Sequence, residues 1–226
     1  MKDIKQKSTV MVVLFLAILI IDQIIKVEVK TNMFLGQKIF ITDWFQLYFV
    51  ENNGFAFGWQ IGGKVFLTLF RIVAVGAIGW FIFKEIQKNA KWGYLVFLCM
   101  IAAGAAGNIF DCLFYGLIFN NPIPPTVAEY VGWGHGYSEF LTGKVVDMFY
   151  FPLIEWDMPT WMPIYSGEHC IFFSPIFNFA DAAISVGVVA LLLFFPKTIS
   201  NSLQTYSDSS KSSRGSRSLD KQQDSK

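Results

Sequence analysis

The segment that decides the fold is residues 92–114, WGYLVFLCMIAAGAAGNIFDCLF, which carries no charge before Asp111. A helix that crosses the hydrocarbon core of a bilayer needs about 20 mostly apolar residues. The small residues in the second half of the segment let another helix approach closely. Asn108 and Asp111 are three residues apart, so they lie on one helical face. The segment therefore predicts a membrane-spanning helix that ends in a polar corner.

Three further segments are long and apolar enough to span a bilayer: about residues 10–29, 64–83 and 177–196. Of the 226 residues, 54% are apolar and 15% charged, whereas soluble domains average about 45–50% and about 25%. A net charge of +1 provides no basic excess for nucleic acid, and the three cysteines follow no CxxC spacing. We predict a membrane all-α protein with four transmembrane helices.

The positions of Lys and Arg predict the orientation of these helices. The N-terminus, the segment between the second and third helices and the tail hold 12 of the 18 basic residues. Because basic residues near the membrane favour the cytoplasm, both termini should be cytoplasmic in a bacterial inner membrane, with residues 31–63 and 115–176 outside. Residues 200–226 are rich in serine and almost devoid of apolar residues, which predicts a disordered tail after a membrane domain of residues 1–199.

The two outer segments predict a small β-sheet and an aromatic-rich region at the membrane surface. Residues 39–49 alternate with a period of two, which is typical of strands, and a turn sequence follows at Asn52-Asn53-Gly54. The second outer segment is rich in Pro, Gly, Trp and Tyr. Amphipathic rings favour the depth of the lipid headgroups, so we expect an extracytoplasmic sheet beside an interfacial loop region.

Ionisable groups in or beside a spanning helix are costly and often functional. Asp22 and Lys26 lie four residues apart on one face of the first helix, where they could form an ion pair or serve as a snorkelling anchor. Asn178 and Asp181 repeat the three-residue spacing at the start of the last helix. At a helix start, Asn178 could serve as the N-cap and the helix dipole would favour the Asp181 carboxylate, so a structural role would explain both residues.

Asp147 is the lone carboxylate of an otherwise apolar stretch just before the last helix. If the chain brings it to Asp181, the two groups cannot both ionise and would share one proton. An aspartic peptidase works in this way, since one carboxylate takes a proton from water and the other protonates the scissile carbonyl. Metal binding has less support, because His135 and His169 are the only histidines and neither has helical spacing to the aspartates.

Five short motifs follow one another along residues 10–196. They are Asp22-x-x-x-Lys26, Asn52-x-Gly54-x-Ala56-Phe57-Gly58, Gly107-Asn108-x-x-Asp111, Val145-Val146-Asp147 and Phe177-Asn178-x-Ala180-Asp181. In this order and on a four-span frame, they resemble the lipoprotein signal peptidases, also called signal peptidase II, which are integral-membrane aspartic enzymes of bacteria. One departure is Cys112, which stands where the family usually has Arg.

The resemblance implies a function and a set of site residues. The family's catalytic pair falls on Asp147 and Asp181. Its other motif positions, which shape and support the site, fall on Asp22, Lys26, Asn52, Gly54, Asn108, Asp111, Asn178 and Ala180. The implied reaction removes the signal peptide of a prolipoprotein just before a cysteine that carries a diacylglyceryl group. Water would be the nucleophile, no cofactor would be required, and we expect a monomer in contact with membrane lipid.

Two other classes of protein compete with this interpretation. A small membrane transporter or proton-relay protein also places Asp and Asn at helix ends. It fits less well, because the polar residues gather at one face of the membrane and none marks a path through the midplane. The third class is an envelope scaffold that binds partners through its aromatic outer segments.

Overall fold

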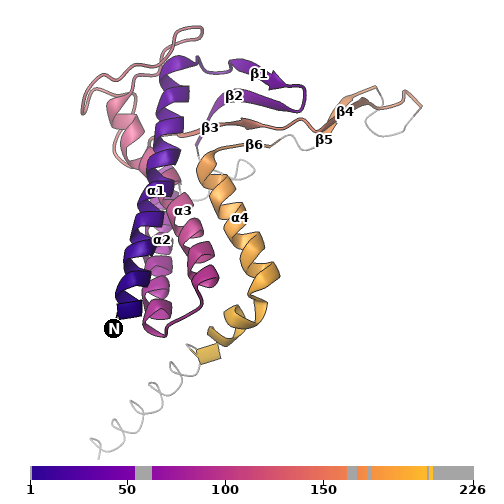
Figure 1. Cartoon of the computed structure of the whole chain (residues 1–226). Helices are drawn as coiled ribbons and strands as arrows, with labels where there is room; N and C mark the ends of the chain where they lie inside the picture. The colour runs from indigo at the N-terminus through magenta and orange to yellow at the C-terminus, as the bar shows by residue number, and fades with distance from the viewer. Residues whose placement is uncertain (1, 54–62, 162–166, 173–174, 203, 206–226) are drawn as a thin grey trace, which may run out of the picture.

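The structure is a computed structural model that describes residues 2–53, 63–161, 167–172, 175–202 and 204–205. The described residues form four long helices, and α3 packs against each of the other three. Their bounds are Lys2–Asn32 for α1, Gly63–Gln87 for α2, Trp92–Ile118 for α3 and Phe179–Phe194 for α4. The helices run alongside one another, and the strands lie across one end of them (Figure 1).

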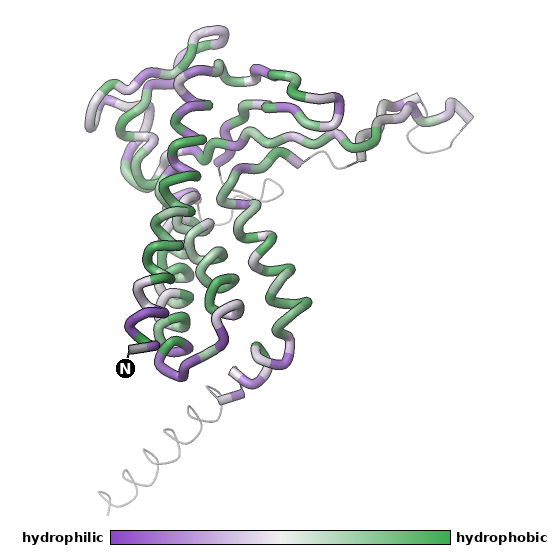
Figure 2. The backbone as a smooth tube through the Cα atoms, viewed as in Figure 1, coloured by the Kyte–Doolittle hydropathy of each residue, from purple (hydrophilic) through white to green (hydrophobic). Residues whose placement is uncertain are grey.

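Three helices, α1, α2 and α3, are long and apolar enough to cross a membrane. A fourth span is complete if α4 is counted together with the helix Pro196–Ser202, from which it is bent by 91°. Figure 2 shows apolar residues along the middle of the helices and polar residues near their ends. The prediction of a mostly helical membrane protein with a small sheet is therefore confirmed.

The sheet has four antiparallel strands in the order β1-β2-β3-β6. Their bounds are Lys38–Thr42, Phe45–Asn52, Val145–Tyr150 and Ile176–Phe177. The short strands predicted from residues 39–49 are present as β1 and β2, which form a hairpin with its turn at Asp43-Trp44. The second outer segment adds β3 and β6, two strands that the sequence pattern did not predict. As a result, the sheet joins the end of α1 to the start of α4 (Figure 1).

A second hairpin, formed by β4 (Ile154–Asp157) and β5 (His169–Phe172), extends away from the helices beyond β3 (Figure 1). Several large aromatic side chains of the outer segments are exposed, among them Trp133, Trp156 and Trp161. This distribution fits an aromatic-rich outer region. Its placement at the lipid interface stays a prediction.

Glycines let α3 and α4 approach closely enough to bring their polar ends together. A Cβ atom at Gly104 would lie 2.4 Å from the carbonyl oxygen of Ala180, and one at Gly187 would lie 2.8 Å from that of Phe97. No side chain fits at either position without moving a backbone. Small residues therefore set the spacing between these helices.

Helical structure continues past residue 199, the predicted end of the membrane domain. The helix Pro196–Ser202 continues past that residue, and the buried Ser202 donates a hydrogen bond to Glu85 of α2 at 3.0 Å. The start of the predicted tail is thus packed against α2, because the Ser202 hydroxyl forms a hydrogen bond with the buried Glu85. Residues 206–226 lie outside the described residues.

Candidate active site

The start of α4 places Asp181 and caps the helix at the same time. The side-chain oxygen of Asn178 accepts a hydrogen bond from the backbone N–H of Asp181 at 2.9 Å, and Asp181 Oδ2 accepts one from the Asn178 N–H at 3.4 Å. This reciprocal capping box satisfies N–H groups that the helix leaves free. The capping role considered from the sequence is therefore present, and it leaves other atoms of both side chains available.

Strand β3 carries Asp147 to the same place. Asn178 Nδ2 donates a hydrogen bond to Asp147 Oδ1 at 2.7 Å, and the Asn52 side chain makes a second hydrogen bond to this carboxyl group. Only 3% of Asp147 is exposed. Asn52 is the last residue of β2, and this strand pairs with β3 beside Asp147. Strand pairing thus brings two predicted site residues together.

Asn108 of α3 links the two carboxyl groups through its amide. Its Nδ2 donates to Asp181 Oδ1 at 2.7 Å, while its Oδ1 accepts from Asn178 Nδ2 at 3.0 Å and from Lys26 Nζ at 2.9 Å. An ammonium group can only donate, so Lys26 fixes which end of the Asn108 amide faces Asp181. Asp147 and Asp181 are therefore bridged by two asparagine amides.

A buried ionic cluster lies behind these amides. Lys26 Nζ is 2.9 Å from Asp22 Oδ2 and 2.8 Å from Asp111 Oδ2, and all three side chains are nearly inaccessible to solvent. Asp22 accepts a hydrogen bond from the backbone N–H of Ala180 at 2.9 Å, and Asp111 accepts one from that of Val146 at 3.3 Å. Asp22 and Lys26 thus form a buried ion pair and not a snorkelling anchor. The cluster ties α1, α3, α4 and β3 together.

The surroundings of Asp147 change its acidity. Burial is the largest cause that raises its pKa, to about 7, and the negative charge of Asp181 adds to this effect. A hydrogen bond from Asn178, the charge of Lys26 and the hydrogen bond from Asn52 act in the opposite direction. A carboxyl group with this pKa can hold a proton at neutral pH and release it, as general acid–base chemistry requires.

One polar residue of the site, Gln23, was missed in the sequence. Its amide nitrogen donates to Asp22 at 3.1 Å, to the Gly107 carbonyl at 3.2 Å and to Asp111 at 2.9 Å, while its oxygen accepts from Tyr115 at 3.0 Å. The available signal was a polar side chain inside a spanning segment, directly after Asp22.

Two positions of the predicted site need separate comment. Gly54 and the motif residues that follow it, Ala56, Phe57 and Gly58, lie outside the described residues. Cys112, at the position of the family arginine, is a buried free thiol whose side chain contacts Thr68 of α2. Among the residues that the structure describes, no group of three or more His, Cys, Asp or Glu side chains could hold a metal ion.

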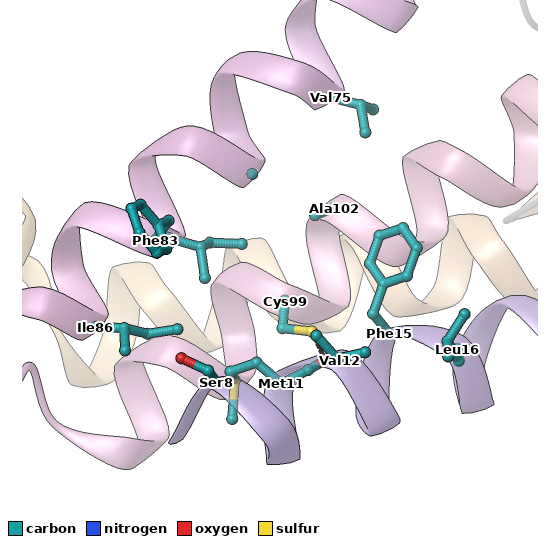
Figure 3. Close-up of a pocket in the computed structure, with 12 residues that line it drawn as sticks. Ser8, Met11, Val12, Phe15, Leu16, Val75, Phe83, Ile86, Cys99 and Ala102 are labelled. Atoms are coloured by element: carbon teal, nitrogen blue, oxygen red, sulfur yellow. Dashed lines mark hydrogen bonds between the residues drawn. The ribbon is translucent and has the colours of Figure 1, made fainter. Parts of the chain in front are cut away.

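A separate hollow lies between α1, α2 and α3, toward the N-terminal end of α1 (Figure 3). Its volume is about 370 Å³, and its walls are apolar apart from Ser8 and Cys99. Met11, Phe15 and Ala102 are among the residues that line it. None of the predicted site residues lines this hollow, so it is distinct from the polar site at the ends of α3 and α4.

The chain has long apolar helices, a sheet across their ends and two aspartates that are bridged by amides where the helices meet the sheet. These are the features of an integral-membrane aspartic peptidase. Residues 14–196 match the model of the family described as signal peptidase (SPase) II. The chain belongs to the signal peptidase II family. The chain is therefore a peptidase, and the two alternative classes, a transporter and an envelope scaffold, are set aside.

Similar proteins and structures agree with this assignment. A lipoprotein signal peptidase from Porphyromonas gingivalis is 46% identical over 195 residues, which cover 86% of each chain. One from Amoebophilus asiaticus is 38% identical over 200 residues, covering 83% of this chain and 78% of that protein. A solved bacterial membrane enzyme has the same fold, with a TM-score of 0.56 and 23% identity, over 85% of this chain and 91% of that one.

Proposed function

We propose that this protein removes the signal peptide from prolipoproteins and that Asp147 and Asp181 are its catalytic pair. The observation that carries the proposal is the amide bridge, in which Asn178 binds Asp147 and Asn108 binds Asp181 while the two amides bind each other. Such a bridge brings together two carboxyl groups that come from segments 34 residues apart, as a shared proton requires.

The two carboxyl groups would have different roles in the first step. With its raised pKa, Asp147 would hold the shared proton and donate it to the scissile carbonyl oxygen. Asp181, as the ionised partner, would take a proton from the attacking water molecule. When the tetrahedral intermediate breaks down, the protonated Asp181 would donate its proton to the leaving amine while Asp147 takes a proton back from a hydroxyl of the intermediate, which restores the starting state. Water and the carboxyl pair supply all the protons of this scheme.

The remaining predicted residues would support this pair. Asn52, Asn108 and Asn178 bind the carboxyl groups directly or through each other. Behind them, the buried cluster would hold the ends of the helices in register, and its members are Asp22, Lys26, Asp111 and the backbone of Ala180. For Gly54 we propose a role in the same site on its motif alone.

We further propose that the substrate carries a diacylglyceryl group on the cysteine directly after the cleaved bond. Lipid chains would hold the bond at headgroup depth, and the carboxyl pair comes from β3 of the sheet and the first turn of α4. The distribution of basic residues supports an inner-membrane location with cytoplasmic termini and an outward-facing site. We propose a monomer that contacts membrane lipid and uses no cofactor.

The test is cleavage of a lipidated prolipoprotein by the protein purified in detergent, with the unlipidated precursor as the negative control. Asp147→Asn and Asp181→Asn should each lower the rate by several orders of magnitude, since either change removes a proton-transfer group. Asp43→Asn is the matched control, because Asp43 is an exposed carboxylate in the turn between β1 and β2. Near-normal cleavage by a folded Asp147→Asn protein would contradict the assignment.

A further inference from the structure

The pairing of β2 with β3 changes register just before the site. Gln46 and Leu47 pair with Tyr150 and Phe149, but the next described pair is Val50 with Asp147. An unbroken register would place Phe49 opposite Asp147, so β2 contains one extra residue, as in a β-bulge. The shift matters because a slip of one residue moves every side chain to the other face of a strand.

The shifted register places the site residues on one face and an ionic cluster on the other. Residues directly opposite each other in antiparallel strands share a face. Asn52 and Val50 therefore share the face of Asp147, and Asn52 is its diagonal neighbour. Glu51 lies opposite Val146, which is fully buried in the core between the sheet and the helices.

Glu51 binds two ammonium groups on that core face. One carboxylate oxygen pairs with Lys30 of α1, and the other lies 2.9 Å from Nζ of Lys144, the residue that precedes β3. Burial opposes ionisation of Glu51, yet the two lysines bring its pKa below the usual value for glutamate. The Tyr137 ring lies 5.3 Å from each ammonium group, and its hydroxyl accepts a hydrogen bond from the Lys144 N–H.

These contacts connect the three segments whose relative position sets the register: α1, the end of β2 and the start of β3. In the unshifted register Glu51 would face away from Lys30, and Asn52 would lie opposite Lys144 on the wrong face for Asp147. Only 4% of the Glu51 side chain and 1% of the Lys30 side chain are exposed, so water cannot replace the lost partners.

We propose that Glu51 is a positioning residue, which fixes the shifted β2–β3 register through Lys30 and Lys144 and so holds Asn52 against Asp147. The proposal rests on the function proposed above, because the position of Asn52 matters only if Asp147 is catalytic. Glu51 itself does not touch the reacting groups. None of the five sequence motifs includes it, and its contribution depends on a contact between β2 and α1.

Disulfide trapping tests the register without reference to activity. In the shifted register Asn52 and Val145 are directly opposite, so the variant Asn52→Cys/Val145→Cys should form a disulfide, detected by peptide mass spectrometry. Adding Glu51→Gln should lower its yield several-fold. The control pair Gln46→Cys/Tyr150→Cys lies before the register change and should cross-link equally with Glu51 or Gln at position 51.

Kinetics then test the consequence for the site. Glu51→Gln and Asn52→Ala should each lower kcat by about tenfold, the factor for one hydrogen bond to a reacting group, and the double variant should be no slower than either. Unchanged trapping of the 52–145 pair, loss of both cross-links, or additive effects on kcat would each overturn the proposal. Activity in Asp147→Asn would instead overturn the proposed function, whatever the trapping result.

Discussion

Replacement of Lys26 by Met should destabilise the protein and slow it, because two buried carboxylates then lose their shared cation. Lys26 lies within 2.9 Å of both Asp22 and Asp111. Removal of one partner from a buried ion pair costs about 3–5 kcal/mol. For a chain of this size 1 kcal/mol lowers Tm by about 2–4 °C, so we expect a decrease on the order of 6–20 °C. Tryptophan fluorescence of the detergent-purified protein during heating measures it.

A second substitution separates the effect of charge from that of shape. The three groups have a formal charge of −1 in the natural protein, −2 in Lys26→Met and −1 again in Asp22→Asn/Lys26→Met. The new asparagine keeps an oxygen for the N–H of Ala180, so the double variant should recover part of the lost Tm. A single variant as stable as the natural protein, or a double variant less stable than the single one, would refute the reasoning.

Three further results are expected. Burial raises the pKa of Asp147 to about 7, and in the proposed mechanism this group holds the shared proton, so kcat/KM should fall as pH rises through about 7; a flat profile to pH 9 would contradict its role as the acid. Gly104→Ala should cost about 1–3 kcal/mol, because its Cβ would lie 2.4 Å from a carbonyl oxygen of α4; Gly76→Ala, with no neighbour within 4 Å, should not lower Tm. Deletion of residues 206–226 should preserve activity and Tm, whereas deletion of 201–226 should lower Tm by a few degrees through loss of the buried serine contact to α2. Equal Tm values for the two truncated proteins would show that this contact adds no stability.

The helices could be predicted from the sequence because the bilayer leaves few alternatives. Backbone groups in hydrocarbon must be satisfied within the segment, so an apolar run of sufficient length is nearly enough to identify a spanning helix. The ends were harder to predict. Helix α2 was expected over 64–83 but continues to Gln87, since Glu85 is buried and paired with Lys88 and Ser202. Apolar periodicity contains no information on such polar partners.

The sheet was only half predictable, and the reason lies in strand β3. Val145, Val146, Asp147 and Met148 are all buried, so β3 shows no alternation of polar and apolar residues. A strand covered on both faces looks like any short apolar run. The register change in β2 depends on a partner strand almost 100 positions later, and no local pattern predicts it.

The sequence predicted the carboxyl pair from chemistry, since an isolated Asp147 in apolar surroundings required a partner. The sequence could not predict how Lys26 lies near Asp147 and Asp181 without causing both carboxyl groups to ionise. A cation in direct contact with both carboxyl groups would favour the doubly ionised state and remove the shared proton. Here Lys26 binds the oxygen of Asn108, whose nitrogen then donates to Asp181, so the cation acts on the pair through an amide. The amide transmits the orientation set by Lys26 and keeps its ammonium group out of direct contact with Asp181, while the charge of Lys26 still acts at a distance to lower the pKa of Asp147.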